Sequence, residues 1–380
     1  GCEPAASLAL SAGGLGVVFA GDWMTLFVCW ELMSLSGLLL VWSRGTPSSR
    51  GAGMRYLLAH ALGAGLLFCG IVLRWAAGGG LAVGPLTPIA GDAGSWLILA
   101  GVAINAAIPP LHCWLTDAYP ECSVSASVVQ SAFATKAAVY VLLRVFPGAE
   151  PLAAVGAAMA LYGAAFALFE DDFRRLLSYH IVSQVGFMVA GVGLGSPLAL
   201  DGAAAHAFCH ILYKALLFMG AGAVISATGK EKLSELGGLG AKMPAVCALY
   251  FVGALAISGF PFLSGFVSKS LTLAAASSER PLLYFILELA SAGTFLSIGL
   301  KAGCFVFAGE AKPLSVGKLP WNSKAAMLIC AALCLAIGLR PQLLYALLPQ
   351  RSVFDPYTLR GALAAVELHL GALAGFALLV

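Results

Sequence analysis

Long apolar runs and short polar segments alternate along the whole chain. Each run approaches the roughly 20 residues that an α-helix needs to cross the hydrocarbon core of a bilayer. No polar interval between runs exceeds about 20 residues, so we expect no soluble domain between them. The pattern predicts about 12 membrane spans, at residues 5–20, 22–42, 53–76, 95–112, 122–146, 149–169, 176–195, 201–227, 243–276, 281–308, 324–347 and 360–380.

Composition supports this interpretation. Of the 380 residues, 60% are hydrophobic and only 10% are charged, whereas roughly a quarter of the residues of a soluble domain are charged. The net charge is +3, but the basic residues form no cluster, which argues against nucleic-acid binding. The ten cysteines include no C-x-x-C pair, so we expect no metal site. The sequence therefore predicts an all-α polytopic membrane protein embedded in the lipid bilayer.

Basic residues in the loops predict the orientation of the spans, because Lys and Arg are enriched on the cytoplasmic side. One side holds the larger set: Arg44, Arg50, Arg55, Arg174, Arg175, Lys230, Lys232, Lys242, Lys312, Lys318 and Lys324. The opposite side holds Arg74, Arg144, Arg280, Arg340, Arg351 and Arg360. We therefore expect the first side to be cytoplasmic.

Several ionisable residues lie inside the predicted spans. A charged residue at the centre of a membrane helix costs roughly 2.5–3.5 kcal/mol on insertion scales, and such residues usually face a hydrated interior and act there. They are Glu31, Lys136, His206, His210, Lys214, Lys269, Glu288, Lys301 and Glu367. The structural alternative is a snorkelling side chain or a static ion pair, and it applies best to Lys301.

Two predicted spans contain a proline-rich interruption. The motif IPPL interrupts the span at residues 108–111, and ISGFPFLSGF interrupts another at residues 257–266. Paired discontinuous helices are typical of transporters built from inverted repeats, with the binding site near the bilayer midplane. Lys136 and Lys269 each follow one of these breaks.

Three titratable residues recur at helical spacing in the span at residues 201–227. His206, His210 and Lys214 are four residues apart, so they lie on one face of a helix. This arrangement favours a proton relay, although a single membrane histidine is as often a helix–helix hydrogen bond. A haem held between histidines would need residues such as His60, His180 and His210, whose spacing suggests nothing of the kind.

Five ordered segments resemble one known family. They are GDWMTLFVCWELMSL at residues 21–35, PPLHCWLTDAYPECSVSASVVQSAFATK at 109–136, EDDFRRLLSYHIVSQVGFM at 170–188, HILYKALLFMGAG at 210–222 and SGFPFLSGFVSKSL at 258–271. The chain is similar to the proton-translocating antiporter-like subunits of complex I, of membrane-bound hydrogenases and of Mrp-type cation/proton antiporters, in the last case to the D-type component. Family members usually carry about three further N-terminal helices, and a chain that begins at Gly1 is consistent with a truncated sequence.

The resemblance implies two inverted five-helix repeats, each with a discontinuous helix. It divides the chain into a first repeat at residues 1–148, a second at 149–310 and C-terminal transmembrane helices at 311–380. The implied proton relay runs from Glu31 and Lys136 through His206, His210 and Lys214 to Lys269, with Glu288 and Lys301 as secondary candidates. One position departs from the family: Asn105 replaces a lysine of the first broken helix. Because asparagine takes up no proton, the first half then depends on Lys136.

The resemblance further implies a proton (or Na⁺/H⁺) translocating subunit of a larger respiratory, hydrogenase or Mrp-type complex. Its partners would be other membrane subunits, in a bacterial or archaeal plasma membrane. The chain carries no redox cofactor motif, so we expect no cofactor in it and any electron transfer in partner subunits. Two alternatives remain: a stand-alone secondary cation/proton transporter, and a scaffold subunit with a defective first half-channel.

Overall fold

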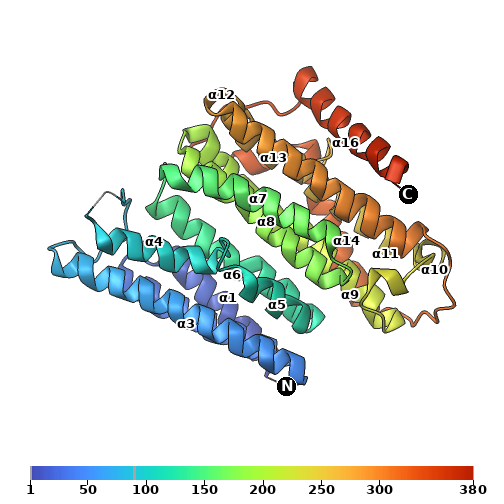
Figure 1. Ribbon diagram of the computed structural model, residues 1–380, viewed down its shortest axis with the longest axis horizontal. Coiled ribbons are helices and arrows are strands. Elements are labelled where there is room, and N and C mark those ends of the chain that lie inside the picture. The colour runs from blue at the N-terminus through green and yellow to red at the C-terminus, as the bar shows by residue number, and fades with distance from the viewer. Residues whose placement is uncertain (1, 89–90, 380) are drawn as a thin grey trace.

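The protein is a bundle of α-helices (Figure 1). The computed structural model describes residues 2–88 and 91–379. The helices in that part are α1 (Glu3–Phe19), α2 (Trp23–Trp42), α3 (Pro47–Ala76), α4 (Ala93–Asn105), α5 (Cys113–Glu121), α6 (Val124–Val145), α7 (Glu150–Phe169), α8 (Phe173–Leu194), α9 (Pro197–Thr228), η1 (Leu233–Glu235), α10 (Leu239–Lys242), α11 (Pro244–Ser258), α12 (Ser264–Glu279), α13 (Pro281–Thr294), η2 (Phe295–Ala302), η3 (Cys304–Ala308), α14 (Trp321–Leu339), α15 (Gln342–Tyr345) and α16 (Leu359–Leu379). These residues form no strand, only isolated bridges between Asp22 and Ala82 and between Asp172 and Lys232. The all-α prediction is confirmed.

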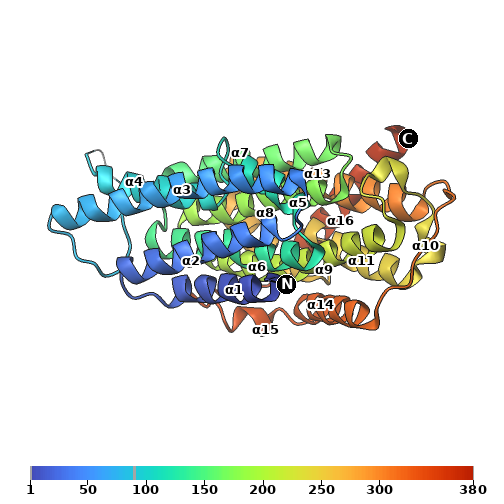
Figure 2. The same cartoon turned by 90° about the horizontal axis from the view of Figure 1, so that it is seen from below.

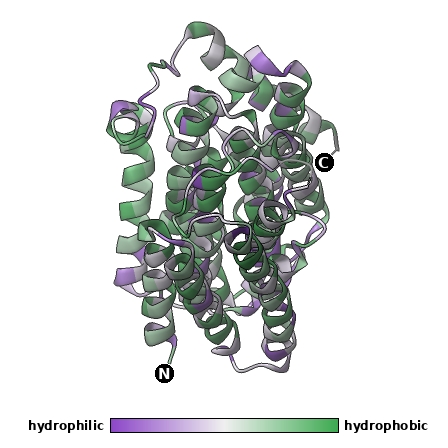
Figure 3. Cartoon of the chain, turned by 90° about the vertical axis from the view of Figure 1, so that its left-hand side faces the viewer, coloured by the Kyte–Doolittle hydropathy of each residue, from purple (hydrophilic) through white to green (hydrophobic). Residues whose placement is uncertain are grey.

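Nine helices within the described ranges are long and apolar enough to cross a membrane. They are α2, α3, α6, α7, α8, α9, the continuous segment Pro281–Ala308, α14 and Gly361–Leu378. Three shorter apolar helices, α1, α4 and α11, fall where further spans were expected. Figure 3 shows that hydrophobic residues dominate the helices and that hydrophilic residues occur in short patches. A polytopic membrane protein is therefore confirmed, while the number 12 stays a prediction.

Three of the expected spans end early as helices or are divided, and α3 begins at Pro47, before the expected residue 53. The span at 95–112 is a helix only to Asn105, the span at 243–276 divides into α11 and α12, and the span at 324–347 ends as a helix at Leu339. Gly1, Ile89, Ala90 and Val380 lie outside the described residues, so the expected ranges 1–148, 311–380 and 360–380 are described only in part. The side chain of Arg360 is likewise not described.

Both predicted helix breaks are present. Residues 106–112 separate α4 from α5, and residues 259–263 separate α11 from α12. Proline cannot donate a backbone hydrogen bond and clashes with the preceding turn, which ends the helix. At the first break the Trp114 indole Nε1 donates to the Ile104 carbonyl (2.8 Å). The break thus leaves this carbonyl satisfied within the protein rather than exposed to lipid.

Helix α9 occupies the centre of the bundle. It packs against α6, α8, α11, α12 and α14, and the two perpendicular views place it in the interior, with α14 and α15 along one face (Figures 1 and 2). We call helices α1–α6 the first group and the helices from α7 onward, apart from α9, the second group, so α6 belongs to the first group and α8, α11, α12 and α14 to the second. Side chains on α9 therefore contact both groups of helices.

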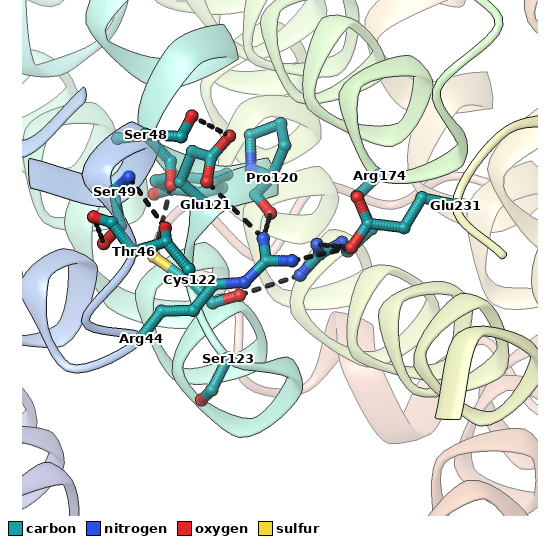
Figure 4. Close-up of polar contacts among 12 residues, drawn as sticks. Arg44, Thr46, Ser48, Ser49, Pro120, Glu121, Cys122, Ser123, Arg174 and Glu231 are labelled. Carbon is teal, nitrogen blue, oxygen red and sulfur yellow. Dashed lines mark hydrogen bonds and ion pairs between the residues drawn. The ribbon is translucent and has the colours of Figure 1, made fainter. Parts of the chain in front are cut away.

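An ion-pair cluster joins segments from both groups at the end of the bundle where α2 ends and α8 begins. Figure 4 shows its contacts. Glu231 Oε1 accepts from Arg44 Nη2 at 2.7 Å and from Arg174 Nη2 at 2.9 Å. Arg44 also donates to the Pro120 carbonyl near the end of α5, and Arg174 to the Cys122 carbonyl just beyond it. We call Arg44, Arg174 and Glu231 the inter-group clamp.

The opposite end of the bundle holds its own contacts. Arg144 donates to the Ala20 carbonyl, and Arg74 pairs with Asp92 at 3.1 Å. Hydrogen bonds from the Ser95 side chain and backbone, followed by the Arg74 charge, hold the pKa of Asp92 below its ordinary value. Arg74 and Arg144 therefore lie at the other end of the bundle from Arg44 and Arg174 (Figure 1), as the sequence predicts; which end faces the cytoplasm stays a prediction.

Candidate functional site

The three spaced residues of α9 lie in the core of the protein. His206, His210 and Lys214 are all 0% exposed. They lie on one face of a continuous helix, as their spacing predicts. We refer to them as the α9 row.

Lys214 and His210 have no hydrogen-bond partner among the described residues. Neither Lys214 Nζ nor either ring nitrogen of His210 forms a hydrogen bond. The Lys214 ammonium lies 5.6 Å from the centroid of the Phe218 ring. Buried polar groups without partners are rare and cost about 1–3 kcal/mol each. The core therefore holds two titratable side chains whose polar atoms are unsatisfied by the described residues.

In contrast, both ring nitrogens of His206 have hydrogen-bond partners. Its Nδ1 lies 3.0 Å from Ser268 Oγ, and its Nε2 lies 3.2 Å from Gln184 Oε1. The Tyr213 hydroxyl also approaches Nε2, at 3.3 Å. These contacts connect α9 to α8 and α12. Because Ser268 directly precedes Lys269, His206 brings the α9 row next to the second broken helix.

Lys269 lies at the edge of a cavity of about 540 Å³. The side chain is 2% exposed, Nζ donates to Ser291 Oγ at 3.2 Å, and it lies 4.6 Å from the Phe187 ring centroid. Glu288 and Ser291 line the same cavity. Lys269 therefore has a polar, partly open surrounding that Lys214 lacks.

Lys136 is buried in α6 and satisfied locally. Its Nζ donates to the Ser131 carbonyl at 2.7 Å and to Thr135 Oγ1 at 3.1 Å. Glu31 is half-buried, and its Oε1 has no hydrogen-bond partner among the described residues. The two side chains do not form an ion pair in this structure. The proposed partnership between Glu31 and Lys136 therefore needs a rearrangement of Lys136.

Asn105 is the last residue of α4, immediately before the first break. It is 1% exposed, and its Oδ1 accepts no hydrogen bond from a described residue. Helix α3 lies close to Asn105, since a Cβ on Gly63 would be in ordinary van der Waals contact with Asn105 Oδ1, at 3.4 Å. The position is therefore buried in the first broken helix, as the motif indicates.

Lys301 has the surroundings of a structural residue. Its Nζ donates to the carbonyls of Leu168 (2.8 Å) and Glu170 (2.6 Å), at the C-terminal end of α7. A cation placed there satisfies carbonyls that the helix leaves free. Glu367 is exposed on α16.

Two of the three histidines considered for haem ligation, His60 and His180, have other partners. His60 Nδ1 contacts the Tyr56 carbonyl at 3.0 Å, and its ring packs on Tyr56 and against Trp114. His180 Nε2 contacts Ser297 Oγ at 2.7 Å. Within the described part of the chain no group of three His, Cys, Asp or Glu residues could hold a metal ion.

Comparison with known proteins identifies the family. The model of the family described as "NADH:quinone oxidoreductase/Mrp antiporter, TM" matches residues 20–297. The chain belongs to this family. The matched range includes every residue of the expected relay from Glu31 to Lys269, together with Asn105 and Glu288, but ends before Lys301.

Relatives of known name occur in several complexes. The chain is 30% identical to the D-type subunit of the Na⁺/H⁺ antiporter of Alkalihalophilus pseudofirmus over 373 residues, which is 91% of this chain and 75% of that one. It is 34% identical to hydrogenase-4 component B of Escherichia coli over 355 residues, 82% of this chain and 52% of that one. A chain in the Mrp complex of Dietzia sp. DQ12-45-1b superimposes with a TM-score of 0.84 at 25% identity, covering 95% of this chain and 77% of that one.

The polar partners of the titratable residues were not among the site residues predicted from the sequence. Gln184, Ser268 and Ser291 bridge the helices around His206 and Lys269. Serine and glutamine are too common in membrane helices to stand out without neighbours in space. His369 was not among the predicted site residues either, although the sequence shows it as a histidine inside the last predicted span.

Proposed function

We propose that this chain is a proton (or Na⁺/H⁺) translocating subunit of a larger membrane complex. The observation that carries the proposal is the α9 row, in which His210 and Lys214 are buried without a hydrogen-bond partner among the described residues, in the helix that contacts both groups of helices. The family match and the relative named as a Na⁺/H⁺ antiporter component support it.

Burial and pairing together give the lysines a way to bind and release protons. A dry surrounding disfavours the charged ammonium, and a nearby carboxylate or hydroxyl favours it. Lys214 has only a dry surrounding. Lys269, in contrast, contacts the Ser291 hydroxyl and lines a cavity that Glu288 also lines. A proton leaving Lys214 or His210 would thus pass, by way of His206 and Ser268, to Lys269.

The first half of the relay would begin at Glu31. Because Asn105 cannot take up a proton, we assign the proton-carrying role of this half to Lys136. In this structure Lys136 is held by Ser131 and Thr135. Translocation would require it to leave these partners and approach either Glu31 or the α9 row.

The proposed architecture is that of two inverted five-helix repeats, at residues 1–148 and 149–310, within about 12 spans. The two broken helices α4–α5 and α11–α12 support this division. The partners would be other membrane subunits in a bacterial or archaeal plasma membrane, since the Mrp neighbour is part of a complex. We assign Lys301 to helix capping rather than to the relay.

Proton flux into vesicles that carry the assembled complex tests the proposal. We expect Lys269→Ala to lower the flux at least ~10-fold, because loss of a proton-transferring group typically costs more than that. Lys318→Ala removes an exposed lysine from a loop and should leave the flux unchanged. Native gels report assembly of both variants. Wild-type flux with Lys269→Ala would refute the relay, and repeating the assay with Na⁺ replaced by choline identifies the ion.

A further inference from the structure

His369 is the buried exception on a largely exposed helix. Helix α16 packs against η2 and α13 and runs along the periphery of the bundle (Figure 1). Leu363, Leu370 and Leu373 on this helix are 45–59% exposed, whereas His369 is 6% exposed. Its ring lies 5.4 Å from the Phe260 ring and 4.7 Å from the Phe295 ring. The helix therefore directs one titratable side chain into the protein.

The hydrogen bonding of His369 fixes the state of its ring. Nδ1 lies 2.5 Å from the Ala365 carbonyl, and a carbonyl can only accept, so Nδ1 is the donor. In the neutral ring the other nitrogen then carries the lone pair. That atom, Nε2, is buried and has no hydrogen-bond partner among the described residues. His369 Nε2 thus carries the lone pair of the neutral ring, with the Ser258 carbonyl of the same cavity close to the ring.

His369 shares its cavity with the last residue of the proposed relay. Lys269, Glu288, Ser291 and His369 all line the cavity of about 540 Å³. The ionisable groups that line this cavity are Lys269 from α12, Tyr284 and Glu288 from α13, and His369 from α16. Phe354, Pro356 and Thr358, which precede α16, form another part of the wall.

We propose that His369 takes the proton from Lys269 across this cavity and is the terminal proton-transferring residue of the chain. An N–H bond of the Lys269 ammonium breaks and an N–H bond forms at His369 Nε2, which leaves a neutral amine and an imidazolium. The imidazolium then releases the same proton to the outside, and the ring returns to its neutral state. This inference rests on the proposed function and extends it to α16, beyond the range matched by the family.

The test measures proton flux in vesicles that carry the complete complex. Glutamine at position 369 keeps a polar side chain of similar reach but cannot accept a proton at the pH of the assay. We expect His369→Gln to lower the flux at least ~10-fold. The matched control is His60→Gln, because His60 is also buried, contacts a carbonyl four residues back through Nδ1 and packs among aromatic rings. It lies outside the cavity lining and should keep wild-type flux.

Chemical rescue separates proton transfer from a structural role. His369→Ala leaves room for free imidazole, and we expect imidazole in the medium to raise the flux of this variant several-fold, while Lys269→Ala gains nothing. Wild-type flux with His369→Gln, or a loss with His369→Ala that imidazole does not reverse, would overturn the proposal. Wild-type flux with His369→Gln, together with loss of flux in Lys269→Ala, would reject the role of His369 and leave the proposed relay standing. Normal flux in both variants rejects the relay as well.

Discussion

Two intramembrane lysines have opposite surroundings. Lys214 is buried with no hydrogen-bond partner among the described residues, whereas Lys301 donates to two carbonyls at the end of α7. Both were recognisable in the sequence as charges inside apolar runs. Their different roles were not, because the distinction depends on carbonyls of a helix more than 130 residues away in the chain.

This difference predicts opposite effects on stability. Lys214→Met replaces an unsatisfied amine with an apolar side chain of similar length, so we expect the free energy of unfolding to rise by ~1–3 kcal/mol. Lys301→Met leaves two carbonyls without their donor and should lower it by a similar amount. Thermal denaturation of the purified complex measures both. Equal shifts for the two variants would contradict this assignment.

At the scale of elements, the helix breaks were predictable and the contacts of the helices were not. Pro109, Pro110 and Pro261 identify the interruptions in the sequence. The bounds of α11 and α12 were missed because the chain remains apolar through the break, so composition alone shows one long span. Likewise, the sequence shows many glycines but does not show which of them lie between helices.

Helices α7 and α8 depend on glycine for their close approach. A Cβ on Gly186 would lie 2.5 Å from the Ala160 nitrogen and 2.6 Å from the Gly156 carbonyl oxygen. Such backbone contact is typical of helix packing in lipid. We therefore expect Gly186→Ala to push the helices apart and to destabilise the protein by ~1–3 kcal/mol.

The control for this variant is Gly371→Ala in α16. A Cβ added there would meet no described residue beyond its own helix turn within 4 Å, and alanine favours a helix by up to ~1 kcal/mol over glycine. Its denaturation temperature should therefore stay level or rise. A fall as large as that of Gly186→Ala would argue against a specific α7–α8 contact.

At the scale of the whole molecule, the two groups of helices meet along α9 and at the inter-group clamp. The clamp joins Arg44 after α2, Arg174 of α8 and Glu231 after α9. The distribution of basic residues in the sequence predicts that Arg44 and Arg174 lie on one side of the membrane, but it does not indicate that they meet at Glu231. The fold class and the relay residues followed from periodicity and motifs, whereas this contact depends on how the helices pack.

Glu231→Gln is expected to loosen the clamp. It leaves two arginines facing each other, one of them with a side chain only 5% exposed. Because Glu231 is 37% exposed, we expect a loss of ~1–2 kcal/mol, less than for a fully buried pair. Glu150→Gln breaks a more exposed pair with Arg280 and should cost at most ~1 kcal/mol. Denaturation temperatures that rank the two variants in the reverse order would contradict the proposed role of the clamp.

The central claim is that buried titratable residues carry protons through the bundle, and Lys214→Met tests it most directly. Because this variant is expected to be more stable than the wild type, loss of activity would not reflect loss of folding. The measurement is proton flux into vesicles that carry the assembled complex. We predict that the flux falls to the background of protein-free vesicles while assembly is retained. Wild-type flux with Lys214→Met would contradict the account.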